Sequence, residues 1–275
     1  MKKARMRQGI PFWKVQGAGN DALIVESRHF PARKAAFVRR MAHRSLGVGA
    51  DQVLEVVRRG PVPEIYFWNC DGSRAELCAN GTRSFLKFAC EQGWLPKGRE
   101  AAIFASGVFR VANFRGSQVE LSLGVPKVAA ESSVSVLGKR FHITPVSTGN
   151  PHAVIFLPKG PRGFDYRVYG AAIECHRKFP KKTNVEFIRK VRARGRAVEL
   201  TVEAWERGAG ATLSCGTGAV AAAAAHRAGC REGMRKDLYY VKMTSFILTV
   251  RFKNTEAFLS GPSSTIAEGF YFANV

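Results

Sequence analysis

The hydrophobic positions along the chain predict many short β-strands and few helices. Most apolar runs are short and rich in β-branched and aromatic residues, which is typical of strands. Turns rich in Gly, Asp and Asn separate these runs. The predicted strands are residues 22–26, 52–57, 64–68, 102–105, 108–114, 118–123, 152–157, 198–205, 238–243 and 246–252.

A few segments show helical patterning instead. Residues 32–42 and 81–92 place apolar side chains three and four positions apart, and Phe85, Phe88 and Ala89 share one face of the second segment. Residues 218–228 are rich in alanine, the residue with the highest helix propensity. Many strands with few helices predict an α+β fold.

Two segments share one layout, in which a strand is followed by a glycine-containing loop, a cysteine, small residues and a helix. Residues 67–88 read FWNCDGSRAELCANGTRSFLKF, and residues 204–225 read AWERGAGATLSCGTGAVAAAAA. This repeat predicts two domains of similar architecture, each with one cysteine directly before a helix. We expect the first domain to cover residues 1–125, joined by 265–275, and the second to cover 126–264.

The chain is strongly basic, because 43 Lys and Arg residues against 21 Asp and Glu residues give a formal net charge of +22 at pH 7. Such a field attracts nucleic acid, acidic membranes or anionic metabolites, and it favours solubility. The basic clusters lack the interleaved aromatics of a nucleic-acid motif, so we expect no nucleic-acid partner. Without a long apolar stretch or a hydrophobic signal region, the chain is expected to be cytoplasmic, with no membrane contact.

The cysteine content argues against disulfides and metal. Six cysteines in 275 residues form no CxxC pair, and the histidines lack metal-ligand spacing to them, so we expect reduced thiols and no metal site. Four of the cysteines have no distinctive setting and are assigned to packing or to the surface; they are Cys70, Cys90, Cys175 and Cys230.

Cys78 and Cys215 are the candidate catalytic residues, because each stands directly before a predicted helix. A single such cysteine is most often a small buried hydrophobe, but its duplication favours function. Unpaired N–H groups at a helix start favour thiolate over thiol, so we expect the pKa of each cysteine to fall. A thiolate base and a thiol acid together can move a proton on and off a substrate α-carbon.

Small residues follow each cysteine and leave backbone N–H groups available to a carboxylate. Binding there would also stabilise the negative charge that develops when the α-proton departs. A phosphate-binding loop is a weaker interpretation, because the Lys-Ser/Thr pair of a P-loop is missing. The residues concerned are Ala79, Asn80, Gly216 and Thr217.

The chain resembles the diaminopimelate epimerase family in ordered blocks between residues 17 and 223. The blocks are GAGNDALIVE (17–26), GVGADQ (47–52), NCDGSRAELCANGTRSF (69–85), GNPHAV (149–154), TNVEF (183–187) and ERGAGATLSCGTGA (206–219). The resemblance implies two pseudo-symmetric domains, each a mostly antiparallel sheet or barrel wrapped around a central helix, with a catalytic cleft between them. It also implies cofactor-independent epimerisation of LL-diaminopimelate to the meso form by a homodimer, in lysine and peptidoglycan precursor biosynthesis.

The resemblance also assigns site residues. Cys78 and Cys215 fall on the family's catalytic cysteines, and the four small residues after them fall on its carboxylate-binding loops. A substrate with two amino-acid ends needs groups for its remote end, where Arg207 can bind a carboxylate and Glu206 an ammonium group. The positions that match substrate contacts are Asn20, Gln52, Asn69, Asn150, Asn184, Glu206 and Arg207.

Two positions depart from the family pattern. Ala79 replaces a glycine, and Ala211 replaces a glutamate next to the second cysteine loop. These departures leave open a racemase or epimerase of another amino acid, such as histidine, on the same scaffold. A non-enzymatic basic binding protein is a third alternative, motivated by the charge, and the retention of both cysteines speaks against it.

Overall fold

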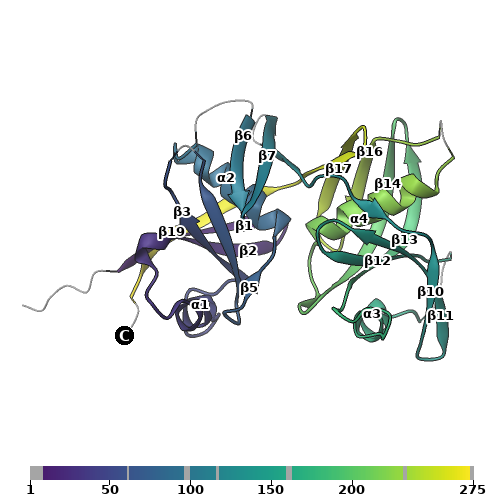
Figure 1. Cartoon of the computed structure of the whole chain (residues 1–275), viewed down its shortest axis with the longest axis horizontal. Coiled ribbons are helices and arrows are strands. Elements are labelled where there is room, and N and C mark those ends of the chain that lie inside the picture. Colours follow the sequence, from purple (N-terminus) through teal and green to yellow (C-terminus); the bar gives the residue numbers. More distant parts are fainter. Residues whose placement is uncertain are drawn as a thin grey trace, which may run out of the picture. The chain divides into compact units, whose positions relative to one another are not determined.

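A computed structural model describes residues 9–60, 62–95, 100–115, 118–158, 163–231 and 234–272. The chain divides into two compact units, and many of their helices and strands are labelled in Figure 1. Unit 1 comprises Met1–Val119 and Ser263–Val275, and unit 2 comprises Glu120–Pro262. The sequence predicts domain boundaries after residues 125 and 264, whereas the two units divide after residues 119 and 262.

Unit 1 contains a mixed sheet in which antiparallel pairs predominate. Its strands are β1 (Ile10–Gly17), β2 (Asn20–Glu26), β3 (Gln52–Val57), β4 (Glu64–Asn69), β5 (Arg74–Ala75), β6 (Glu100–Ala105), β7 (Val108–Arg115) and β19 (Ser263–Tyr271). β1 is antiparallel to both β19 and β2, and β2 is parallel to β3. β4 is antiparallel to both β3 and β5. β6 pairs with β4 in parallel and with β7 in antiparallel orientation.

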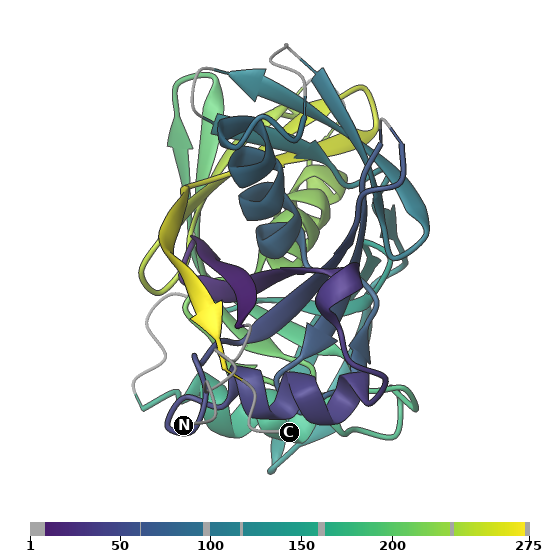
Figure 2. The same ribbon diagram turned by 90° about the vertical axis from the view of Figure 1, so that its left-hand side faces the viewer.

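The helix α2 (Ala79–Glu91) packs against β1, β2 and β19, so that the strands of unit 1 surround it (Figures 1 and 2). Its apolar residues Phe85, Leu86, Phe88 and Ala89 are fully buried, as the sequence pattern predicted for three of them. Burial of each large apolar side chain contributes about 1.5–3 kcal/mol, which holds the helix N-terminus in place. The 3-10 helix η1 (Ser27–His29) and α1 (Lys34–Ala42) connect β2 to β3.

Unit 2 has a longer sheet of the same mixed kind. Its strands are β8 (Gln118–Ser122), β9 (Lys127–Val128), β10 (Ser132–Val136), β11 (Lys139–Ser147), β12 (Pro151–Phe156), β13 (Asn184–Arg194), β14 (Ala197–Glu206), β15 (Gly210–Ala211), β16 (Leu238–Lys242), β17 (Ile247–Lys253) and β18 (Glu256–Ser260). Only β12 with β13 and β14 with β16 are parallel among the described pairs of this unit.

The helix α4 (Gly216–Gly229) lies against strands β11 to β14 and β16 to β18 of unit 2 (Figure 1). Every residue from 216 to 225 is buried, because alanine and glycine let surrounding strands approach the helix closely. A second helix, α3 (Tyr166–Glu174), begins at the N-cap Asp165, whose carboxylate accepts the Arg167 N–H at 2.9 Å. It connects β12 to β13, as α1 connects β2 to β3.

The two units repeat one order of elements. In each unit, a first strand is followed by a helix and by a second strand that pairs with the first in parallel. A third strand then pairs antiparallel with the second and with a two-residue strand that follows it. The central helix comes next, and the strand after it pairs in parallel with the third strand. β2, α1, β3, β4, β5, α2 and β6 therefore correspond to β12, α3, β13, β14, β15, α4 and β16. The α+β fold with two repeated halves is confirmed.

The predicted strands all coincide with observed ones, and each predicted helix is present. The elements that were not predicted are strands β1, β5, β9, β10, β11, β13, β15, β18 and β19, helix α3 and the 3-10 helix η1. β13 ends in the exposed basic run 190–196, which reads as a solvated charge cluster, and β11 contains Pro145. None of the described helices is both long and apolar enough to cross a membrane.

Candidate active site

Each central helix starts at a cysteine that serves as its N-cap. The Cys78 sulfur accepts the Gly81 N–H at 3.3 Å, and the Cys215 sulfur accepts the Gly218 N–H at the same distance. Both cysteines have extended backbone angles, with φ of −122° and −117°. An N-cap side chain satisfies one of the N–H groups that a helix start leaves without an intrahelical partner. The two thiols therefore occupy the same local setting, as the repeat predicted.

In unit 1 the predicted polar residues gather at neighbouring strand ends beside Cys78. Asn20 begins β2, and its side-chain oxygen accepts the Cys78 thiol at 3.3 Å. Gln52 begins β3 and lies opposite Asn69 at the end of β4. Asn69 donates its side-chain N–H to Ser73 Oγ at 3.0 Å. The Gln52 side-chain oxygen is buried and has no hydrogen-bond partner among the described residues, so it can accept a donor from a ligand.

In unit 2 the predicted residues gather in the same way around Cys215. Asn150 donates to Thr217 Oγ1 at 3.4 Å, and Thr217 Oγ1 lies 3.6 Å from the Cys215 sulfur. Asn184 begins β13, and its side-chain oxygen accepts the Arg207 N–H at 2.9 Å. Glu206 accepts the hydroxyl of Thr212. The unit therefore brings every predicted residue of its sequence range to one end of its sheet.

A buried His152–Glu186 pair lies at this end of unit 2 and was not predicted from the sequence. His152 Nδ1 lies 2.7 Å from Glu186 Oε1, and Nε2 lies 3.0 Å from the Asn150 side-chain oxygen. Neither side chain of the pair is exposed to solvent. His152 stands in the block GNPHAV and Glu186 in TNVEF, so the pair links two of the family blocks.

A second unpredicted group is a buried arginine on α2. The Arg83 side chain is fully buried and donates to the Asn80 side-chain oxygen at 2.9 Å. Burial lowers the pKa of Arg83 to about 10, and the opposing effect is its interaction with Cys78. The guanidinium therefore keeps its charge at neutral pH and favours the thiolate form of Cys78.

The expectation that helix position lowers the pKa of both cysteines is wrong for Cys215. Burial, followed by the negative charges of Glu206 and Glu186, raises its pKa well above the usual value, and the hydrogen bonds from Thr217 and Gly218 only partly oppose this. Desolvation by burial also raises the pKa of Glu206. At neutral pH Cys215 is therefore a protonated thiol, suited to donate a proton.

We predict that Glu206→Gln lowers the pH at which half of the Cys215 thiol reacts with iodoacetamide. Glutamine keeps an oxygen for the Thr212 hydroxyl but removes a negative charge that disfavours the thiolate. The measurement follows alkylation of the Cys215 peptide by mass spectrometry as a function of pH. Glu203→Gln, on the same strand and paired with Arg189, is the matched control and leaves the midpoint unchanged. An unchanged midpoint in Glu206→Gln contradicts the electrostatic explanation.

The two departures from the family pattern occupy different environments. Ala79 is the first residue of α2 and is 3% exposed, so its methyl group is packed inside unit 1. Ala211 lies opposite Trp205 in the short β14–β15 pairing and is exposed.

The remaining cysteines lie outside this arrangement. Cys70 and Cys175 are exposed, whereas Cys90 and Cys230 are partly buried. All six cysteines lie in described segments, and the structure joins none of them in a disulfide. No group of three or more His, Cys, Asp and Glu side chains within the described ranges is arranged to hold a metal ion.

Comparisons with known proteins cover most of the chain. The family model described as diaminopimelate epimerase matches residues 12–126 and 144–265. A diaminopimelate epimerase from Methanocella arvoryzae is 34% identical over 277 residues, covering 94% of this chain and 96% of that protein. One from Burkholderia pseudomallei is 33% identical over 289 residues, covering 94% and 97%.

Solved structures share the fold at low sequence identity. A phenazine biosynthesis family protein from Bacillus anthracis aligns with a TM-score of 0.69 and 14% identity, covering 96% of this chain and 99% of its own. A hydroxyproline epimerase from Agrobacterium vitis aligns with a TM-score of 0.66 and 14% identity, covering 97% and 93%. At such identities the likeness concerns the fold alone.

Proposed function

This chain belongs to the diaminopimelate epimerase family and is an amino-acid epimerase, and from that premise we propose that it interconverts LL- and meso-diaminopimelate by using Cys78 and Cys215 as its two acid–base groups. The observation that carries the proposal is the duplicated helix start, where each thiol caps a central helix beside polar strand ends. Two such thiols supply the base and the acid that inversion at a carbon requires.

In the proposed reaction, the Cys78 thiolate removes the α-proton and the Cys215 thiol donates its proton to the opposite face of the same carbon. Arg83 favours the thiolate at Cys78, whereas burial followed by the charges of Glu206 and Glu186 favours the thiol at Cys215, which supports Cys78 as the base in this direction. After one turnover the protonation states are exchanged, and the reverse reaction uses Cys215 as the base. No atom is gained or lost in either direction.

Removal of an α-proton from an amino acid is difficult because negative charge develops on the carboxylate and the α-carbon. We propose that backbone N–H groups at Ala79–Asn80 and Gly216–Thr217 bind the reacting carboxylate. The positive end of each helix dipole stabilises the charge there without any cofactor. Gln52, with its buried oxygen, and the four asparagines Asn20, Asn69, Asn150 and Asn184 supply further polar contacts to the substrate.

The remote end of diaminopimelate is a second zwitterion, and we assign Arg207 to its carboxylate. We predict that Arg207→Ala raises KM for diaminopimelate by about 10–100-fold, because a charged hydrogen bond contributes about 1.5–3 kcal/mol, and lowers kcat by a smaller factor. Steady-state kinetics in both directions measure this. Lys181→Ala, which removes an exposed neighbouring cation, is the control and leaves KM nearly unchanged. Equal effects in both variants would mean that the general positive field binds the substrate.

The proposal includes the cellular role implied by the resemblance. The enzyme would act as a homodimer in the cytoplasm, without pyridoxal phosphate, in lysine and peptidoglycan precursor biosynthesis. Light scattering of the purified chain at several concentrations tests the homodimer, and full activity after exhaustive dialysis tests the absence of a cofactor.

The deciding experiment follows proton exchange by NMR in D2O, with reducing agent and no added cofactor. LL-diaminopimelate is compared with histidine, lysine and glutamate. Deuterium entry at the α-carbon of diaminopimelate, with meso product, supports the proposal. Exchange only in another amino acid assigns the enzyme to that substrate instead, and folded, reduced protein that exchanges none of them contradicts an epimerase of these substrates.

A further inference from the structure

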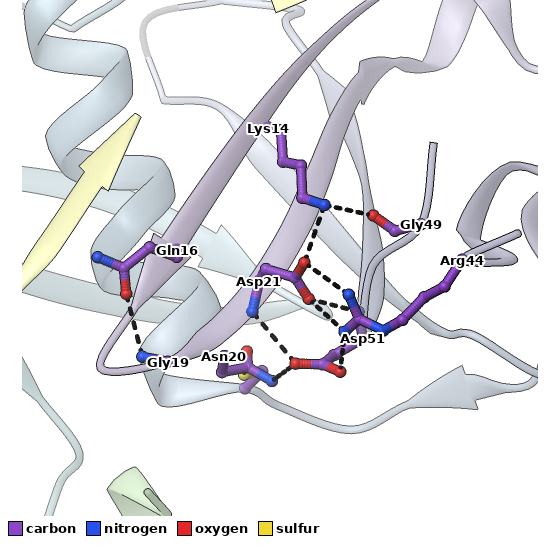
Figure 3. Close-up of polar contacts among 9 residues, drawn as sticks. Lys14, Gln16, Gly19, Asn20, Asp21, Arg44, Gly49 and Asp51 are labelled. Atoms are coloured by element: carbon purple, nitrogen blue, oxygen red, sulfur yellow. Dashed lines mark hydrogen bonds and ion pairs between the residues drawn. The ribbon is translucent and has the colours of Figure 1, made fainter. Parts of the chain in front are cut away.

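Charged side chains gather beside Asn20 at the starts of β2 and β3 (Figure 3). Asn20 in turn contacts Cys78. The Asn20 oxygen accepts the Cys78 thiol at 3.3 Å, and its amide nitrogen donates to Asp51 Oδ2 at 3.4 Å. Asp51 stands directly before β3, in the block GVGADQ, and the proposed reaction assigns it no role. One side chain therefore bridges the sulfur and a carboxylate.

Asp51 is held by a reciprocal pair of hydrogen bonds with Asp21. The Asp51 N–H donates to Asp21 Oδ1 at 2.8 Å, and the Asp21 N–H donates to Asp51 Oδ2 at 3.2 Å. These bonds join the starts of the parallel strands β2 and β3, where the ladder bonds begin. Each carboxylate thus has a fixed position relative to the backbone that carries Asn20.

Arg44 contacts both carboxylates, whereas Lys14 contacts only that of Asp21. Arg44 donates to Asp21 at 2.9 and 3.1 Å and to Asp51 Oδ1 at 2.7 Å, as Figure 3 shows. Lys14 lies 3.0 Å from Asp21 and donates to the Gly49 carbonyl at 2.7 Å. Burial opposes ionisation of Asp21, but the bonds from Arg44, Asp51 and Lys14 hold its pKa at about 2. Burial and the Asp21 charge raise the pKa of Asp51, and Arg44 opposes this.

Both Asp51 oxygens accept hydrogen bonds, Oδ1 from Arg44 and Oδ2 from the Asp21 N–H, so the Asn20 amide faces Asp51 with its NH2 end. The oxygen end must then face Cys78. We propose that Asp51 is a positioning residue that fixes the orientation of the Asn20 amide and thereby presents an acceptor oxygen to the Cys78 thiol. This inference rests on the proposed function, because it concerns the acid–base group of that reaction.

The orientation matters because Cys78 must accept and release a proton in each cycle. An oxygen at the sulfur favours the thiol, which balances the preference of Arg83 for the thiolate. If the amide turned, its NH2 group would donate to the thiolate and stabilise it further. A thiolate stabilised in this way is a weaker base, and α-proton removal slows.

The test is the pH dependence of iodoacetamide alkylation at Cys78, measured by mass spectrometry on the reduced full-length chain without substrate. In Asp51→Asn the new amide can donate to Asn20, which then turns, so we expect the alkylation midpoint to fall by about one pH unit. Asp237→Asn, which removes an exposed carboxylate paired with Arg227, is the matched control with no shift.

A double-mutant cycle separates orientation from simple loss of charge. In the Asn20→Ala background, Asp51→Asn should give no further shift, because no amide remains to be turned. A shift of equal size in both backgrounds overturns the proposal, since Asp51 would then act by charge alone, and so does the absence of any shift in Asp51→Asn. If Asp51→Asn does not fold, the exposed Arg44→Gln, which loosens Asp51, replaces it in the same cycle with a smaller shift.

This readout is independent of turnover. If the parent enzyme exchanges no substrate proton, the proposed function fails while the alkylation cycle still reports on Asn20. If exchange occurs and the cycle shows no coupling, the proposed function stands and only the role of Asp51 is overturned.

Discussion

Cys78→Ser and Cys215→Ser are each expected to lower kcat/KM for epimerisation by at least about 10³-fold in both directions. A serine hydroxyl is far too weak an acid to supply the alkoxide or to replace the thiol as proton donor at neutral pH. Its oxygen still accepts the N–H of Gly81 or Gly218, so the helix cap is kept. Loss of activity can therefore be attributed to lost chemistry.

NMR of the product from each isomer of diaminopimelate measures this, and thermal unfolding verifies that the variants fold. Cys90→Ala is the matched control, because Cys90 lies on α2 but away from its N-terminus, and it should retain near parental activity. Parental turnover in either serine variant would rule out the two-thiol mechanism.

The second large effect is expected from Gly218→Ala on α4. A Cβ at this position would lie 2.6 Å from Glu186 Oε1 and 3.1 Å from the Cys215 sulfur. Glu186 is fully buried and paired with His152, so it has no space to retreat. Overpacking of this kind costs about 1–3 kcal/mol, which exceeds the roughly 1 kcal/mol gained from the helix propensity of alanine. We expect lower stability together with a large loss of activity, because both groups flank the Cys215 thiol.

Gly81→Ala is the matched control for this prediction, since Gly81 holds the same position after Cys78. Its added Cβ would meet the Cys78 sulfur and Phe67 at 3.4 Å, an ordinary contact, so unfolding free energy should stay equal or rise by up to about 1 kcal/mol. Urea unfolding of both variants measures the difference. Equal destabilisation would mean that the helix start tolerates no side chain in either unit.

Local pattern was sufficient for most of the fold. Strands such as β3, for which the predicted and observed bounds are both 52–57, are short runs rich in valine and leucine and need no distant partner to be recognised. The end of β13 is basic and exposed, and it is a strand because β14 pairs with it from residue 194 back to residue 185. Pairing between distant segments thus overrode the local signal there.

In the candidate site too, some features follow from local sequence and others depend on tertiary contacts. The duplicated cysteine, glycine and helix pattern placed both thiols at helix starts, because capping depends on residues within one turn. The pKa of Cys215 moved in the opposite direction to the one expected, because burial and the carboxylates of Glu206 and Glu186 outweigh the helix terminus. Neither burial nor those charges can be seen in the local sequence.

By itself, the sequence determined the α+β class, the repeat and the two thiols, since each follows from the order of residues along one segment. Only the tertiary structure decided that Asp21 and Asp51 hold each other and that His152 meets Glu186. Both contacts join neighbouring parallel strands whose residues lie about thirty positions apart in sequence, with |i−j| of 30 and 34. Such contacts exist only once the connecting helices α1 and α3 have brought those strands side by side.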